Sequence, residues 1–286
     1  MKQAATLARP ASSNVPVLRI GAHLILLFGA FIMVLPFLWI IATSLKPPPE
    51  VIAFPPTFIP KEPTFNNFVE VFQRAPFPRF FLNSLIVSTI ATVSVVFTST
   101  LAGYVFAKYQ FPGRNLLFLL VLATAMVPFE TYMIPLYLEM KQVSLINTYP
   151  ALVAPELIMS FGIFLMRQTI IASLPDELLD AARIDGASEW RIFRQIVIPL
   201  MSSAMGALAI FAFLSSWGAF IWPLLITSSR DLWTMELGLG MFQFRFTVDY
   251  GPIAAGSLIS LLPILLVFLV LRRNIIRGIT LTGLKG

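Results

Sequence analysis

Six long apolar stretches constrain what this chain can fold into more than any other feature of its sequence. A helix needs about 20 apolar residues to cross a hydrocarbon core about 30 Å thick. Stretches of this kind lie at about residues 21–44, 81–107, 115–138, 149–166, 201–222 and 253–271. Their apolar residues surround the whole helix, which suits burial in lipid or in a bundle. The sequence therefore predicts an all-α polytopic membrane protein with six transmembrane helices.

The composition excludes several other classes of protein. Hydrophobic residues make up 57% of the 286 residues and charged residues only 12%, whereas soluble domains carry about 25% charged residues. The chain has no cysteine and one histidine, His23. This excludes disulfides, iron–sulfur clusters, cysteine-based zinc sites and multi-histidine metal sites. The first apolar stretch is too long for a signal-peptide core, so we expect it to remain as an anchor.

The placement of charge predicts the orientation of the chain. With the N-terminus in the cytoplasm, 13 of the 20 Lys and Arg residues fall in inside segments and the others in outside segments, as the positive-inside rule requires. We therefore expect both termini in the cytoplasm. Residues 1–18 form an N-terminal arm, 19–272 the six-helix domain and 273–286 a C-terminal tail. This topology explains the net charge of +6, so no nucleic-acid partner is indicated.

The connection at residues 168–200 is the most informative part of the chain, and its pattern predicts two short cytoplasmic helices joined by a glycine turn. Ser173 and Asp176 have the spacing of a capping box at the start of the first helix. Asp185 and Gly186 are expected to end that helix, because glycine readily adopts the left-handed conformation found at helix ends.

The second predicted helix begins at Ser188, which can cap it, and is expected to end near Pro199. One interpretation of this helix pair is an ordinary loop on the bilayer surface. The other is a protein docking site, because its small Ala-Ala and Gly-Ala surfaces suit close contact and its acidic face does not suit an anionic leaflet. The residues alone leave both interpretations open. The acidic residues are Asp176, Glu177, Asp180, Asp185 and Glu189.

The stretch LDAARIDGASEWRIFRQIVIP closely resembles the cytoplasmic signature loop of the membrane subunits of bacterial ABC importers. That pattern has an acidic residue, Ala-Ala, Asp-Gly-Ala, a Phe and a Pro at fixed spacing. Asp180 stands where the family usually has Glu, which keeps the charge. The directly matching residues are Ala181, Ala182, Asp185, Gly186, Ala187, Phe193, Ile196 and Pro199.

Other segments resemble, more narrowly, the smaller permease subunit of maltose-type carbohydrate importers, and the resemblance extends over nearly the whole chain. One departure concerns the residue after Trp217, which is often Asn in the family and is Gly218 here. The resembling segments are TSLKPPPEVIAFPP, NSLIVS, FAKYQFPGR, WPLL and GITLTGLKG.

The resemblance implies the fold of an ABC importer type I permease in the bacterial cytoplasmic membrane, with this chain as half of a heterodimeric pore. The implied partners are a second permease subunit, two ATP-binding subunits and an extracytoplasmic solute-binding protein. ATP and Mg²⁺ would be bound by the ATP-binding subunits, and this chain would hold no cofactor. The implied function is translocation of a sugar or oligosaccharide by alternating access.

The resemblance also implies roles for particular segments. In similar proteins the signature loop sits in a cleft of an ATPase subunit, so residues 180–188, including Ser188, would form the docking turn. Phe193 and Ile196 would anchor the helix that follows. The tail at 273–286 would approach the ATPase interface, and the outer loop at 228–250 would face the solute-binding protein.

The sequence contains no site for catalysis that we can recognise. It has no G-x-x-x-x-G-K-[ST] phosphate loop, so we do not expect the chain to bind ATP through the usual backbone cradle. No nucleophile, base and orienting group form a set either. The chain is therefore expected to be a transport subunit that takes its energy from a partner.

Two carboxylates and two tryptophans in the apolar stretches are candidates for a substrate path. Glu130 and Glu156 each lie near a proline, and ionisable groups inside a membrane are functional candidates by default. Their other interpretation, which we favour, is a solvated position near the outer interface. Trp217 and Trp222 could stack on sugar rings, although residues of this type more often form an interfacial aromatic belt.

Three alternatives to a sugar permease remain at this point. The first is an ABC permease for another small polar solute, such as a polyamine. The second is an ion-coupled carrier or channel, which would place charged residues near the middle of several helices, where this sequence has almost none. The third is a membrane scaffold, which would leave the turn at Gly186 without a purpose.

Overall fold

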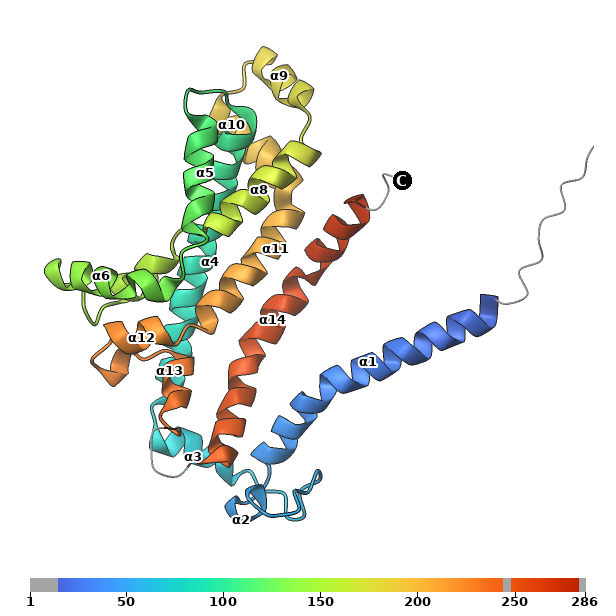
Figure 1. The fold of residues 1–286 in the computed structure, drawn as a ribbon, viewed down its shortest axis with the longest axis vertical. Coiled ribbons are helices and arrows are strands. Elements are labelled where there is room, and N and C mark those ends of the chain that lie inside the picture. The colour runs from blue at the N-terminus through green and yellow to red at the C-terminus, as the bar shows by residue number, and fades with distance from the viewer. Residues whose placement is uncertain (1–14, 244–247, 283–286) are drawn as a thin grey trace, which may run out of the picture.

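The computed structural model describes residues 15–243 and 248–282, and this part of the chain is helical without strands (Figure 1). Within it, four helices are long and apolar enough to cross a membrane, and the number is six if each of two bent helix pairs counts as one span. The prediction of six spans is confirmed on that count. The four long helices are α1 (Val15–Ser44), α4 (Phe77–Lys108), the helix from Glu189 to Trp217, and α14 (Tyr250–Thr282).

The two bent pairs show how proline breaks a span. The axes of α5 (Arg114–Thr124) and α6 (Phe129–Gln142) differ by 95°. Pro128, in extended conformation, separates them, because proline disfavours a helical conformation in the residue before it. Pro135, the second proline of this stretch, lies inside α6 without ending it.

The fourth span is less strongly bent. It consists of α7 (Tyr149–Val153) with η1 (Ala154–Glu156), followed by α8 (Ser160–Ser173), and the bend between the two parts is 46°. Residues 157–159 form the break, which follows Pro155 and Glu156 directly.

The helices α4, α8 and α11 (Ile198–Trp217) pack against one another as the centre of the fold, and α14 lies along α11 (Figure 1). Close contact between α4 and α8 depends on two glycines. A Cβ on Gly103 would lie 2.8 Å from the Met166 Cβ atom, and one on Gly162 would lie 2.4 Å from the Ser99 hydroxyl. Small residues thus let the two helix backbones approach, as is common in membrane bundles.

Helix α1 diverges from this bundle (Figure 1). It packs against α14, and none of its most apolar 18-residue window is buried within the chain. The shorter elements lie at the two ends of the bundle and beside it. They are α2 (Pro48–Val51), α3 (Asn66–Arg74), α9 (Asp176–Ile184), α10 (Glu189–Ile192), η2 (Phe193–Val197), α12 (Ile221–Ile226), η3 (Arg230–Leu232) and α13 (Met235–Gly240).

Candidate functional site

The first candidate site is a helical elbow, which we define as α9, the turn at residues 185–188 and α10. It projects from one end of the bundle (Figure 1). Gly186 has a φ of +78°, and the two hydrogen bonds of a Schellman motif close the helix before it. The amide of Ala187 donates to Ala182 O and the amide of Gly186 to Arg183 O, both at 3.0 Å. The predicted glycine turn is confirmed.

The start of each elbow helix tests a predicted cap. Ser188 caps α10 as expected, because its hydroxyl accepts a hydrogen bond from the Arg191 amide. The capping box at Ser173 and Asp176 was wrong. Ser173 ends α8, and the residue that precedes α9 is Pro175, which has no polar side chain and makes no cap hydrogen bond.

The prediction that the second helix ends near Pro199 was also wrong. The helix runs without a break from Glu189 to Trp217. Just before the proline, η2 is a π-helical turn in which the Ile198 amide donates to Phe193 O. This wider turn changes the hydrogen-bond pattern where proline lacks its N–H donor, so the helix continues through Pro199.

Charged side chains hold the elbow in shape. Arg183 donates from Nη1 to Asp180 at 2.9 Å and from Nε to Glu189 at 2.8 Å. The Tyr109 hydroxyl donates to the other Glu189 oxygen. The hydrogen bond that Arg183 donates to Glu189 raises the pKa of Arg183 further above its ordinary value, so this guanidinium stays charged. Lys108, at the end of α4, pairs with Asp176 at 2.6 Å. These contacts fix the elbow to the end of α4.

Tyr109 keeps its proton in this arrangement. Burial raises the pKa of the Tyr109 phenol well above its usual range, and the hydrogen bond to Glu189 adds to the shift. The hydroxyl is therefore a donor throughout the physiological range of pH. A phenol donor and a guanidinium donor on the same carboxylate restrict Glu189 to one orientation.

The outer side of the elbow presents apolar side chains that nothing in the described chain covers. Ile184 is 86% exposed and Trp190 is 57% exposed. They directly follow Arg183 and Glu189, which form an ion pair with each other. Beneath them Phe193 is buried and lies 5.5 Å from the Trp190 ring and 5.9 Å from the Tyr104 ring. The elbow thus presents exposed apolar side chains above a packed aromatic base.

The structure gathers the signature residues into this elbow and the two turns of helix that follow it. Ile196, next to Phe193, is half-buried against the same apolar cluster, and Pro199 is exposed on the continuing helix. Ala182 and Ala187 are half-buried on the inner side of the turn. The exposed members are Asp180, Ala181, Asp185, Gly186 and Ser188.

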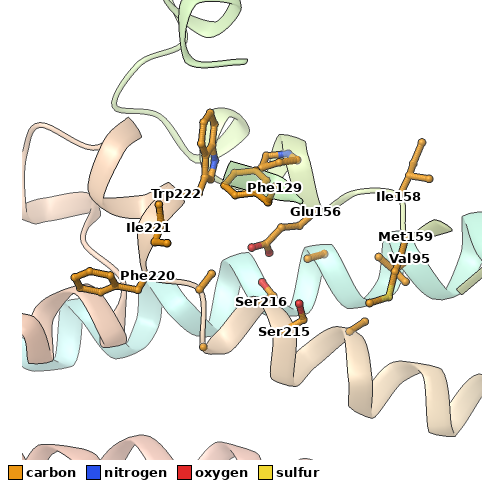
Figure 2. Close-up of a pocket in the computed structure, with 15 residues that line it drawn as sticks. Val95, Phe129, Glu156, Ile158, Met159, Ser215, Ser216, Phe220, Ile221 and Trp222 are labelled. Carbon is orange, nitrogen blue, oxygen red and sulfur yellow. The ribbon is translucent and has the colours of Figure 1, made fainter. Parts of the chain in front are cut away.

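The second candidate site is a cavity of about 450 Å³ inside the membrane region. Its walls come from α4 (Ala91 and Val95), from the break in the fourth span, and from the junction of α11 with α12. Aromatic side chains line one end (Figure 2). Its size and mostly apolar lining are those of a small-molecule site.

Glu156 is the one ionisable residue in the lining of this cavity. Figure 2 shows its carboxylate and the Ser216 hydroxyl pointing toward one another. Glu156 Oε2 and Ser216 Oγ are both shielded from solvent, and neither has a hydrogen-bond partner among the described residues. The expected solvated position at the outer interface therefore does not describe Glu156.

The other three substrate-path candidates lie in different settings. Glu130 is exposed and outside the cavity lining. Trp217 is only 1% exposed, and its indole donates to the Ser260 hydroxyl at 3.0 Å, so it belongs to the packed core. Trp222 lines the cavity and donates to Ala151 O at 2.9 Å. Because both tryptophans are buried, the interfacial belt was the wrong interpretation for them.

Several lining residues escaped the sequence reasoning. Ser215 and Ser216 sit together at the end of a long apolar run in α11, and Phe129 and Phe220 follow helix breaks. A polar pair beside Trp217 and Gly218, at the end of a span, was the available signal. It carries no information on which distant helix faces it, so Glu156 could not be matched to Ser216.

At the opposite end of the molecule from the elbow, α3 and the start of α14 meet. Arg74 pairs with Asp249 at 2.6 Å, and exposed apolar residues such as Phe54 and Ile59 follow α2. The predicted outer loop at 228–250 is described except for 244–247. The arm at 1–14 and the last tail residues, 283–286, lie outside the described part of the chain.

Comparison with known proteins gives a family, named relatives and solved structures. The family model described as "Binding-protein-dependent transport system inner membrane component" matches residues 99–280. The arabinooligosaccharides transport system permease protein AraQ of Halalkalibacterium halodurans is 39% identical over 91% of this chain and 94% of that protein. The lactose transport system permease protein LacG of Rhizobium radiobacter is 33% identical over 89% and 92% of the two chains.

Two solved structures share the fold. One chain of a bacterial ABC transporter involved in the import of the acidic polysaccharide alginate matches with a TM-score of 0.76, over 93% of this chain and 99% of that chain, at 18% identity. A chain of the alginate transporter in complex with its alginate pentasaccharide-bound periplasmic protein matches with a TM-score of 0.63 over 91% and 95%, at 15% identity.

Proposed function

The chain belongs to the family of binding-protein-dependent transport system inner membrane components, and from this premise we propose that it carries an oligosaccharide through the cytoplasmic membrane by alternating access. It is a permease subunit of an ABC importer and not an enzyme. The arabinooligosaccharide and lactose permeases among its relatives support a sugar as the substrate. The chain works with an extracytoplasmic solute-binding protein, as does the alginate transporter.

The main support for this mechanism is the exposed apolar surface of the elbow. Its apolar side chains Ile184 and Trp190 are largely uncovered by the described chain. Lys108 and Tyr109, at the end of α4, hold the elbow through Asp176 and Glu189. Exposed apolar residues on a rigid projection are typical of a protein contact. We assign this contact to an ATP-binding subunit that binds ATP and Mg²⁺. Movement of that subunit would reach the membrane helices through the elbow.

The exposed surface of helix α1 is the observation that favours a second permease subunit. Its apolar window is not buried within the chain at all, whereas the other three long helices bury 28–39% of theirs. In our proposal a related subunit covers part of this surface, and lipid covers the rest. The two permeases together enclose the pore, and each receives one ATP-binding subunit.

The orientation follows from the same proposal. The elbow and the C-terminal end of α14 lie toward the same end of the bundle (Figure 1), and 13 of the 20 Lys and Arg residues fall on the side assigned to the elbow. We place this side in the cytoplasm. The end with α3 and α13 then faces the solute-binding protein.

A pair of glycine substitutions tests the role of the elbow. Gly186 and Gly113 both have positive φ, +78° and +82°, and both have open space around the Cβ position. Proline cannot adopt either conformation. In reconstituted transporter, Gly186→Pro should uncouple sugar uptake from ATP hydrolysis while the protein stays inserted, and Gly113→Pro should disturb only the nearby turn.

A surface substitution separates docking from folding. Ile184→Lys changes a side chain that is almost fully exposed, so it should leave thermal stability unchanged within about 0.5 kcal/mol. It should nevertheless weaken the association with the ATP-binding subunit and lower uptake. Normal uptake and assembly in both Gly186→Pro and Ile184→Lys would refute the assignment of the elbow.

A further inference from the structure

The cavity beside Glu156 has the properties of a built binding site. A shielded polar atom without a partner is costly, and it is retained where a ligand or an ordered water supplies the hydrogen bond. Here two such atoms, Glu156 Oε2 and Ser216 Oγ, face each other across the same cavity. Ser215 adds a third polar group to the lining. Glu156 comes from η1 and the two serines come from α11, and the three groups converge on one volume of about 450 Å³.

The rest of the lining suits one face of a sugar ring. Phe129 and Trp222 meet edge to face with their centroids 5.8 Å apart, and both line the cavity with Phe220. Aromatic and aliphatic surface can cover the C–H face of a pyranose or furanose, while carboxylate and hydroxyl groups bind its rim of hydroxyls. A carboxylate is acceptor-only, so it requires donors from the ligand.

The charge of the cavity sets a limit on the ligand. Glu156 is the one ionisable residue in the lining, so among the lining residues no cation compensates it. A ligand with its own acid group would bring two negative charges together in a poorly solvated space, which is unfavourable. A neutral sugar instead supplies several hydroxyl donors at no electrostatic cost.

We infer that this cavity is a subsite for a neutral sugar unit, in which Glu156 accepts hydrogen bonds from ring hydroxyls and disfavours sugars that carry an acid group. The inference rests on the proposed function and adds a substrate class to it. A cationic amine would also satisfy the carboxylate. The hydroxyl pair favours the neutral sugar, because serine hydroxyls both donate and accept, as sugar hydroxyls do, whereas an ammonium group only donates.

The absence of cysteine from the chain permits a direct test of the charge in the cavity. Ser215→Cys introduces a single thiol into the lining. Its rate of modification is measured in the complete transporter with a cationic and an anionic methanethiosulfonate reagent, and the label on this chain is read by mass spectrometry. The cationic reagent should react faster, and adding Glu156→Gln should reduce the ratio of the two rates about tenfold.

Glu130→Gln is the matched control, because it removes the same charge from a neighbouring but exposed position outside the lining. It should change the rate ratio by less than about twofold, since water screens an exposed charge. An unchanged ratio in Glu156→Gln, or an equal fall in Glu130→Gln, would overturn the inference.

Protection by substrate tests the sugar itself. Arabinotriose, lactose and diacetylchitobiose are supplied with the solute-binding protein and ATP, and the sugar that is imported should slow modification of Ser215→Cys at least about threefold. If Ser215→Cys itself blocks import, Ala219→Cys serves as the reporter on the same wall. Import without protection at both positions overturns the subsite alone. A wild-type transporter that imports spermidine and none of the sugars overturns the proposed function.

Discussion

The elbow and the membrane cavity share one continuous helix, from Glu189 to Trp217, yet their charged side chains are treated in opposite ways. In the elbow, which is exposed to water, Arg183, Asp180 and Glu189 are paired with one another. In the cavity, the Glu156 Oε2 atom is shielded from solvent and has no hydrogen-bond partner among the described residues. Exposed pairs contribute little net stability but define a geometry, whereas a shielded carboxylate without a partner is a cost that function must justify. The paired charges suit the elbow to a fixed shape, and the unpartnered carboxylate oxygen suits the cavity to binding a ligand.

Two continuous helices connect these regions. Helix α4 contacts the elbow through Lys108 and lines the cavity through Ala91 and Val95. The helix from Glu189 to Trp217 begins in the elbow and contributes Ser216 to the cavity. In the proposed mechanism, a displacement of the elbow would reach two walls of the cavity through these two helices.

The largest effect is expected for Glu189→Ala, which removes the shared acceptor of Arg183 and Tyr109. Each contact is partly exposed and contributes at most about 1 kcal/mol. Glu189 accepts from both residues, however, so its loss should free the elbow from Tyr109 at the end of α4. The amount of sugar imported per ATP hydrolysed should fall at least about tenfold in proteoliposomes. In Glu189→Gln, which keeps an acceptor oxygen, the sugar imported per ATP should be intermediate. A wild-type ratio in Glu189→Ala would show that coupling does not depend on the contact between Glu189 and the end of α4.

The next effect concerns the packing that makes α4 and α8 one body. Gly103→Ala places a methyl group 2.8 Å from the Arg167 backbone nitrogen and the Met166 Cβ atom. Overpacking of this kind costs about 1–3 kcal/mol, which should lower the thermal unfolding temperature in detergent. Gly29→Ala, a helical glycine with open space around it, is the control and should not be destabilising. Equal unfolding temperatures would mean that the two helices are not tightly held.

A smaller effect should distinguish the two tryptophans. Trp217→Phe loses the hydrogen bond to Ser260 in the core, and Trp222→Phe loses the one to Ala151 O. Each should cost about 1 kcal/mol of stability in thermal unfolding. Sugar protection of the Ser215→Cys thiol should weaken in Trp222→Phe alone, because Trp222 lines the cavity. Equal loss in both variants would show that protection reports stability and not cavity shape.

The smallest effect is expected for Asp180→Asn. The ion pair between Asp180 and Arg183 is exposed to solvent on both sides, and such pairs contribute at most about 1 kcal/mol. Thermal stability should change by less than about 0.5 kcal/mol, with Glu189 still holding Arg183. A larger destabilisation would show that the elbow depends on each member of its charge network separately.

The positions of the spans and of the elbow turn could be predicted because they depend on local patterns. Apolar length identifies a span, and Gly186 lies where a helix of this composition must end. The capping box at Ser173 and the end at Pro199 were mispredicted for a related reason. Each prediction rested on a valid local preference that the neighbouring helix overrode. Helix α8 extends to Ser173, so this serine cannot cap α9, and a π-helical turn before Pro199 lets the helix continue through the proline.

The amino-acid pattern was enough to place this chain in a membrane, to divide it into spans and to locate an acidic turn between two of them. Hydrophobic period and glycine conformation act over a few residues, and the printed sequence contains all of that information. The packed arrangement alone separated Glu156 from Glu130 and buried Trp217 away from the cavity that Trp222 lines. These distinctions depend on which distant helix lies opposite each side chain, and no local pattern encodes that.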